Sequence, residues 1–165
     1  MGAIYRPSRN IEATLIEFLE TQLASGGWTG ITVEKGYARV YTITLPVICV
    51  RVETTDHDSI EIGSRTTKRI ALVTIDLFCK NDGQRLDLKD FLVSILKDGC
   101  PYYKFVTTTT GRSTAVSTRT ADGKLVVLNI EDVPVEFETP KSELTVHDRY
   151  RHRLSVSVNK TAVEA

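Results

Sequence analysis

The sequence predicts one α+β domain, in which two α-helices pack on a mostly antiparallel β-sheet. Three observations lead to this prediction: residues 68–99 combine a strand pattern with a helical one, residues 8–25 repeat the helical pattern, and shorter strand patterns fill most of the remaining chain. At 165 residues the chain has the length of a single domain, spanning 1–165, with a core of its own. We place that core at about 8–99 and 147–158, with a β-rich excursion over about 106–145.

Residues 68–99 form the predicted centre of the fold. Apolar side chains alternate along the strand, and Val73 and Phe78 add apolar groups to its second face, which is typical of a central strand. After a tight turn at 81–83, Asp82 is placed to cap a helix, and Gly99 fits the left-handed position after its end. The helix carries one apolar stripe, made by Leu88, Phe91, Leu92, Ile95 and Leu96.

The segments before this centre predict a helix and several strands. Ser8 is a possible N-cap for the helix over 8–25, and the glycines at 26–27 end it. Strands are expected at 31–35 and 45–52, with Pro46 restricting the start of the second one to an edge or a first position. The other expected segments are an extended piece at 38–43, a polar turn at 54–59, a short strand at 59–63 that closes a hairpin, and a polar loop at 63–68.

The C-terminal third predicts short strands around polar loops. We expect an extended segment at 101–106, a flexible threonine-rich tip at 107–112, an edge strand at 134–138 and a loop at 140–144. The dipeptide Asp122–Gly123 favours a two-residue type I′ turn between strands at 114–120 and 124–130. In the last strand, 149–158, successive side chains alternate between an apolar face and a polar, solvent-facing one.

Composition excludes several classes of function. Lys plus Arg and Asp plus Glu both count 21, so the net charge is zero and no strong attraction to nucleic acid or an anionic membrane is expected. No apolar run is long enough to span a membrane, and the N-terminal residues do not resemble a signal peptide, which predicts a protein made in the cytosol. Cys49, Cys79 and Cys100 lack metal-site spacing and are expected to be buried free thiols.

Catalytic motifs are missing from the sequence, so we expect a protein that is not an enzyme and has no catalytic, cofactor or metal site. No further group of metal-binding residues lies near the run Asp56–His57–Asp58 in the sequence. No serine or cysteine in a recognisable nucleophile motif accompanies His147 or His152. The scattered glycines form neither a dinucleotide fingerprint nor a P-loop.

One enzyme class remains as an alternative, because the predicted order of helix, strands and helix is also the skeleton of a metal-dependent nuclease. Asp76 could be offered as the metal-binding aspartate of that fold. No Glu-x-Lys motif follows on a later strand, however, so Asp76 is expected to lie on the solvent side or against a helix.

Three arginines on the wet face of the last strand form a candidate interaction surface. Arg149, Arg151 and Arg153 project from one side over roughly 13–14 Å. They could form a solvated face, follow a phosphate backbone, or grip carboxylates of another subunit.

Three segments carry a resemblance to a known family. They are IEIGS at 60–64, RIALVTIDLFCK with DGQRLDLKDFLVSILKDG at 69–99, and VHDRYRHRLSVSV at 146–158. With the N-terminal helix, their layout over about 8–160 resembles the tail terminator, or tail completion, proteins of tailed bacteriophages and related head-to-tail joining proteins. The long segment 100–145 departs from the smallest members of that family.

The resemblance implies a structural virion protein located in the tail or neck and assembled in the host cytoplasm. Such a subunit forms a homo-oligomeric ring, commonly a hexamer, that caps the tail tube and stops its polymerisation. Its implied partners are other copies of itself, the tail tube protein, the head connector or stopper protein and, in a contractile tail, the sheath. Genomic DNA passes through the lumen without sequence-specific binding, and no membrane is involved.

Loops and sheet edges are the working surfaces that the resemblance implies. The expected subunit or partner interface comprises Asp56, His57, Asp58, Arg65, Lys68, Arg112, Arg119, Arg149, Arg151 and Arg153. A head-completion or stopper protein, a soluble adaptor without a ring and the nuclease remain as alternatives. Zero net charge suits a channel wall that lets DNA slide, since each phosphate contact adds affinity.

Overall fold

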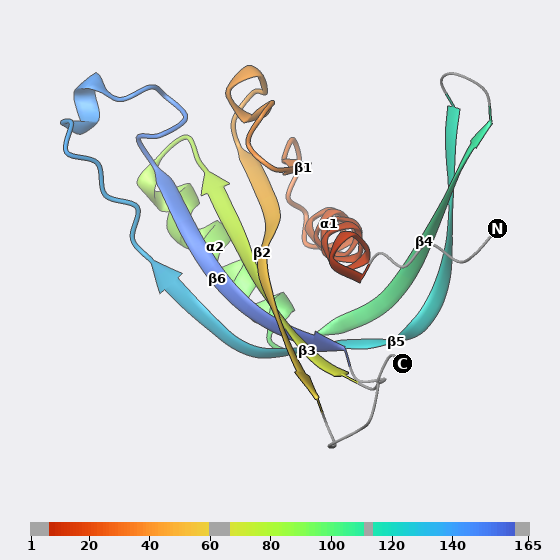
Figure 1. The fold of residues 1–165 in the computed structure, drawn as a ribbon. Coiled ribbons are helices and arrows are strands. Elements are labelled where there is room, and N and C mark those ends of the chain that lie inside the picture. The colour runs from red at the N-terminus through yellow and green to blue at the C-terminus, as the bar shows by residue number, and fades with distance from the viewer. Residues whose placement is uncertain (1–6, 60–66, 111–113, 161–165) are drawn as a thin grey trace.

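The computed structural model describes residues 7–59, 67–110 and 114–160. The elements follow one another as α1 (Pro7–Ser25), β1 (Thr32–Lys35), β2 (Val47–Ser59), β3 (Thr67–Phe78), α2 (Asp82–Leu96), β4 (Cys100–Thr110), β5 (Thr114–Val133) and β6 (Arg151–Lys160). Two short 3-10 helices, η1 (Val40–Thr42) and η2 (Lys141–Glu143), lie in the connections. The predicted mixed α+β class is confirmed, and Figure 1 shows the arrangement.

One six-stranded sheet forms the frame, with the strand order β1-β2-β3-β6-β5-β4. The pair β1–β2 is parallel and every other pair is antiparallel. β3 lies inside the sheet between β2 and β6, as its two apolar faces predict. Pro46 directly precedes β2, where its missing N–H costs no ladder hydrogen bond.

Both helices pack on the same face of this sheet, which we call the helix face. One buried cluster joins the stripe of α1 to the stripe of α2 and to alternate residues of the strands. The helix residues in it are Ile11, Leu15, Leu19, Leu23, Leu88, Leu92 and Leu96. Each large side chain buried in this way contributes about 1.5–3 kcal/mol before entropy is subtracted.

Phe91 of α2 and Trp28, which follows α1, lie at the edge of the core. Phe91 is only half-buried and packs on Trp28 with 5.9 Å between ring centroids, so the predicted stripe of α2 is apolar at five positions but fully buried at three.

Cys49, Cys79 and Cys100 are buried and free, as predicted. In the described part of the chain, neither helix is long and apolar enough to cross a lipid bilayer.

The opposite face of the sheet is covered at one end only. A second cluster buries Val40, Leu45, Val47, Cys49 and Phe78 beneath the connection that precedes β2. The prediction of an extended piece at 38–43 is therefore wrong, because η1 folds this segment back so that Val40 is fully buried.

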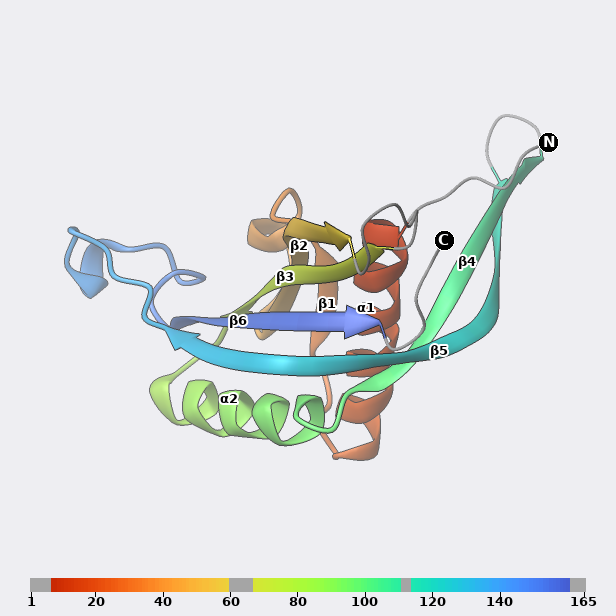
Figure 2. The same ribbon diagram turned by 60° about the horizontal axis from the view of Figure 1, so that its bottom comes forward.

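β5 is the longest strand and pairs with different neighbours along its length. Thr114–Leu125 pairs with β4, whereas Leu125–Val133 pairs with β6. Beyond the main sheet, β4 and the first half of β5 therefore continue as a two-stranded extension, which we call the β4–β5 ribbon. Figure 2 shows β5 running from beside β6 into this ribbon, and Figure 1 shows the sheet curving around α1.

The predicted turn at Asp122–Gly123 is wrong. Both residues lie inside β5, opposite the register shift between Pro101 and Tyr103 of β4, and Gly123 takes a φ of +83°. The glycine therefore lies in a β-bulge, where two residues of β5 oppose one residue of β4. Pairing with β4 and β6 on either side of the bulge outweighs the local turn preference.

Three other predicted loops or strands differ from the structure. The expected turn at 54–59 is the end of β2, because it pairs with the start of β3 from Thr67 to Leu72. The expected tip at 107–112 remains in strand β4 as far as Thr110. The expected edge strand at 134–138 forms no strand, and the strand at 59–63 and the loop at 63–68 fall largely outside the described residues.

The N-cap of α2 lies one residue before its predicted position. Asn81, not Asp82, caps α2, since its side chain accepts a hydrogen bond from Gln84 N at 2.8 Å, and Gln84 Oε1 accepts one from Lys80 N at 2.8 Å. α1 begins at Pro7, a residue favoured at the first helical position, so Ser8 lies inside the first turn. Gly99 has the predicted left-handed conformation, with a φ of +73°.

Helix α1 covers the outer edge of β4 near its base. Thr14 Oγ1 lies 3.3 Å from Tyr103 O and 3.2 Å from Tyr103 N, and Asn10 Oδ1 accepts from Phe105 N at 3.2 Å. These two buried polar side chains therefore replace part of the strand ladder that an edge strand lacks.

Thr14→Val should lower the free energy of unfolding by about 1–3 kcal/mol, because it leaves the N–H and C=O of Tyr103 without their partner. Chemical denaturation measures the change. Thr21→Val is the matched control, since the exposed Thr21 hydroxyl bonds only to its own helix at Glu17 O. Equal losses in the two variants would contradict the edge-capping role.

Candidate functional site

A buried carboxylate lies on the sheet face opposite the helices. Asp76 of β3 pairs in register with Arg153 of β6, and the side chain of Asp76 is 0% exposed. Arg153 Nε donates to Asp76 Oδ1 at 2.7 Å, and Arg151 Nη2 donates to Oδ2 at 2.6 Å. Tyr37, from the connection after β1, donates its hydroxyl to Oδ2 at 2.8 Å. We call these four residues the Asp76 cluster.

Asp76 remains charged within this cluster. Burial by itself would raise the pKa of Asp76, but hydrogen bonds from Arg153, Arg151 and Tyr37 lower it below its ordinary value. Burial and the bond to Asp76 raise the pKa of Tyr37 to about 12, so its hydroxyl stays protonated and donates.

The prediction that Asp76 lies on the solvent side or against a helix is wrong. The residue is on neither surface, because the connection before β2 and the arginines of β6 enclose it. Both carboxylate oxygens accept hydrogen bonds from guanidinium groups. To bind a metal ion or accept a proton, Asp76 would first have to displace an arginine, so its geometry is that of an anchor between strands. Among the described residues, no group of three or more His, Cys, Asp or Glu side chains is arranged to hold a metal ion.

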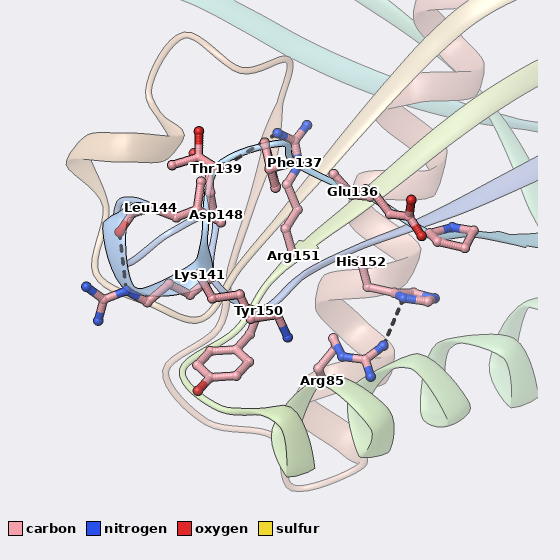
Figure 3. A pocket seen from close by; sticks show the side chains of 13 residues that line it. Arg85, Glu136, Phe137, Thr139, Lys141, Leu144, Asp148, Tyr150, Arg151 and His152 are labelled. Atoms are coloured by element: carbon pink, nitrogen blue, oxygen red, sulfur yellow. Dashed lines mark hydrogen bonds and ion pairs between the residues drawn. The ribbon is translucent and has the colours of Figure 1, made fainter.

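The loop from β5 to β6 covers a cleft beside the cluster. Its volume is about 430 Å³, and it lies between residues 134–152 and the first turn of α2 (Figure 3). The lining residues are Arg85, Pro134, Val135, Glu136, Phe137, Thr139, Lys141, Leu144, Asp148, Arg149, Tyr150, Arg151 and His152. We call this the loop cleft.

A charged network forms one wall of the loop cleft. His152 Nδ1 lies 3.1 Å from Arg85 Nη1, and His152 Nε2 lies 2.9 Å from Asp132 Oδ1. Because the guanidinium can only donate to Nδ1, the neutral ring carries its proton on Nε2 and donates it to Asp132. Arg85 also donates to Asp82 at 2.8 Å, so this wall is fixed to the start of α2.

Hydrogen bonds donated by Arg149 and accepted by Asp148 hold the loop in place. Arg149 donates to Leu144 O at 3.2 Å and to Ser142 O at 3.5 Å. Asp148 accepts from Tyr41 Oη at 2.9 Å and from Thr145 Oγ1 at 3.0 Å. The loop is therefore held in a defined conformation, although it contains no strand.

A smaller hollow of about 260 Å³ lies between α1 and the base of the β4–β5 ribbon. Arg119 of β5 stacks over the ring of Tyr103 at 4.4 Å and forms an ion pair with Glu17 of α1. Arg119 was predicted as an interface residue, and the structure places it where it joins the ribbon to the helix.

The structure separates the predicted arginine face into two environments. Arg151 and Arg153 point toward Asp76, with 13% and 36% of their side chains exposed, whereas Arg149 precedes β6 and holds the loop. The face is therefore half-buried, and a freely solvated row of three arginines is not found.

The other predicted interface residues are dispersed. Asp56 and His57 are exposed near the end of β2, where His57 Nδ1 accepts from Arg69 Nε at 3.1 Å. Asp58 and Lys68 are backbone register partners in the pairing of β2 with β3. Arg65 and Arg112 lie outside the described residues.

Sequence reasoning missed Tyr37, Arg85 and the pair His152–Asp132. The one available signal was Asp76 itself, a charged residue in the middle of an apolar central strand. Comparison of the sequence with models of known protein families and with curated proteins found no match.

Proposed function

We propose that the chain is a structural subunit of the head-to-tail joint of a tailed bacteriophage, and that it works as a tail terminator ring. The shape of the subunit is the observation that supports this proposal best. In Figures 1 and 2 the β4–β5 ribbon and the 134–150 loop extend from opposite ends of the body. A subunit with projections at two ends can contact both neighbours in a closed ring, where every interface joins two different surfaces.

The β4–β5 ribbon offers backbone groups for such contacts. In the described residues, the first half of β5 pairs only with β4, so its other edge carries no ladder. Monomeric proteins usually protect edges of this kind, while assemblies use them to add strands from a neighbour. We propose that the ribbon contacts the next subunit or the tail tube.

The proposed interface also uses the exposed end of the β2–β3 hairpin, where Asp56 and His57 lie. We assign Arg151 and Arg153 instead to the stability of the subunit, because both form ion pairs with Asp76. The role requires no catalytic residue, and the anchored carboxylate of Asp76 fits a structural protein better than a nuclease.

Electron microscopy of particles that lack this protein tests the proposal. A terminator stops tube growth, so its loss should give tails of uncontrolled length. Loss of a stopper, the neighbouring alternative, should instead give filled heads that leak DNA while tail length stays normal. Particles with normal tails and retained DNA would contradict both roles.

A further inference from the structure

We propose that the loop cleft binds an extended acidic segment of a partner protein. The proposal rests on the charges and shape of the cleft alone and does not depend on the ring. Its volume of about 430 Å³ lies within the range of about 300–1,000 Å³ that ligand pockets occupy. It therefore has room for a few side chains of a peptide.

The cations of the loop cleft outnumber its anions. Four cationic side chains line it, Arg85, Lys141, Arg149 and Arg151, against the carboxylates of Glu136 and Asp148. Asp148 is already engaged by two hydroxyl groups and lies 3.6 Å from Arg151. Arg85 and Arg151 are themselves paired with Asp82 and Asp76. The cations that remain for a carboxylate entering the cleft are therefore Lys141 and Arg149.

Two of these cations have no carboxylate partner in the described part of the chain. Among the described residues, Arg149 donates to the carbonyl oxygens of Ser142 and Leu144. The Lys141 ammonium group lies over the ring of Tyr150, with 5.5 Å from Nζ to the ring centroid. Figure 3 shows the Lys141 side chain running toward Tyr150, while the Arg85 guanidinium turns toward His152. Lys141 is thus available to pair with an incoming carboxylate.

Apolar groups in the same cleft favour a peptide over a small inorganic anion. Phe137 is 39% exposed, and Leu144 and Tyr150 also line the cleft. Aromatic and aliphatic groups next to a few cations match a segment that alternates acidic and apolar side chains. A free phosphate would leave these apolar surfaces without a partner.

Duplex DNA fits the loop cleft poorly. DNA gains affinity by many phosphate contacts spread over a convex surface, and a recessed cleft reaches few of them. Glu136 and Asp148 would also repel a continuous row of phosphates. An acidic peptide can place single carboxylates beside Lys141 and avoid these two groups.

Binding of a fluorescein-labelled peptide, Glu-Leu-Glu-Leu-Glu-Leu, measured by anisotropy on the full chain, tests the proposal. We expect saturable binding that weakens as the salt concentration rises, because the contacts are charged. Lys141→Glu should weaken it at least about tenfold, since one charge-assisted contact is replaced by repulsion. Lys97→Glu is the matched control, because Lys97 is exposed at the far end of α2 and makes the same change of charge.

Binding measurements with other ligands test whether the cleft prefers an acidic peptide. A peptide with glutamine in place of glutamate should not bind, and inorganic phosphate should compete only weakly. Absence of acidic-peptide binding, equal weakening by Lys141→Glu and Lys97→Glu, or equal binding of the glutamine peptide would overturn the proposal. Duplex DNA binding that depends on Lys141 when the peptide does not bind would overturn it in favour of a nucleic-acid site.

Discussion

Asp76→Asn should lower the free energy of unfolding by about 3–5 kcal/mol, the cost of removing one partner from a buried ion pair. The amide cannot accept at both positions, so its NH₂ group would face a guanidinium whichever way it turns. Arg153 is 36% exposed and can recover some solvation, which places the loss toward the lower end of this range. Arg151 is only 13% exposed and carries most of the penalty.

Asp90→Asn is the matched control for this variant. Its side chain is 77% exposed, so the same substitution should change stability by no more than about 0.5 kcal/mol. Denaturation at neutral pH measures both variants. A loss in Asp76→Asn no larger than in Asp90→Asn would show that the cluster contributes nothing to folding.

The pH dependence of unfolding provides a second measurement on the same variant. The pKa of Asp76 is lowered in the folded protein, so its contribution is full well above the ordinary value of 3.8 and is lost as the pH falls below it toward the lowered pKa. The difference in stability between wild type and Asp76→Asn should therefore shrink in acid. A difference that stays constant from neutral pH to strong acid would contradict the charged state of Asp76.

Gly99→Ala should lower the free energy of unfolding by at least about 3 kcal/mol, with contributions from both backbone strain and a steric clash. Gly99 has a φ of +73°, and an added Cβ would lie 2.2 Å from Leu125 O, a backbone atom at the centre of β5. Since neither backbone can move without breaking the pairing of β5, the clash cannot be relieved cheaply.

Gly27→Ala separates the two contributions. Gly27 has a similar φ of +79°, but an added Cβ would meet no atom within 4 Å, so only backbone strain of about 1–2 kcal/mol is expected. Thermal or chemical denaturation of the two variants gives the difference directly. Equal losses would mean that the close approach between Gly99 and β5 is not a constraint of the fold.

The elements that could be predicted from the sequence are those whose signal is local. The apolar stripes of α1 and α2, the two-sided β3 and the alternation in β6 each follow from the periodicity of one short segment. β5 could not be predicted as one strand, because Asp122–Gly123 favours a turn locally and only pairing with β4 and β6 overrides it. The end of β2 was missed for the same reason.

The candidate site was less predictable than the fold, since its contacts join distant parts of the chain. Arg151 and Arg153 were identified as a surface from their spacing, but their partner Asp76 lies more than seventy residues earlier, at separations of 75 and 77. Alternation indicates which residues share a face, and it does not say whether a connection will cover that face. Tyr37 closes the cluster from such a connection.

The mass of the purified protein, measured by size-exclusion chromatography with light scattering, tests the ring most directly. The comparison is a variant in which a two-residue Asn-Gly turn replaces residues 106–118, joining the register pair Phe105 and Arg119 and keeping the contacts of α1. We predict that the wild type assembles into a ring, either by itself or when tail tubes are present, with a mass that is a multiple of its 18.4 kDa subunit. The variant should remain a folded monomer. A wild type that stays monomeric with tube and connector proteins present, or a variant that assembles equally well, would contradict the account.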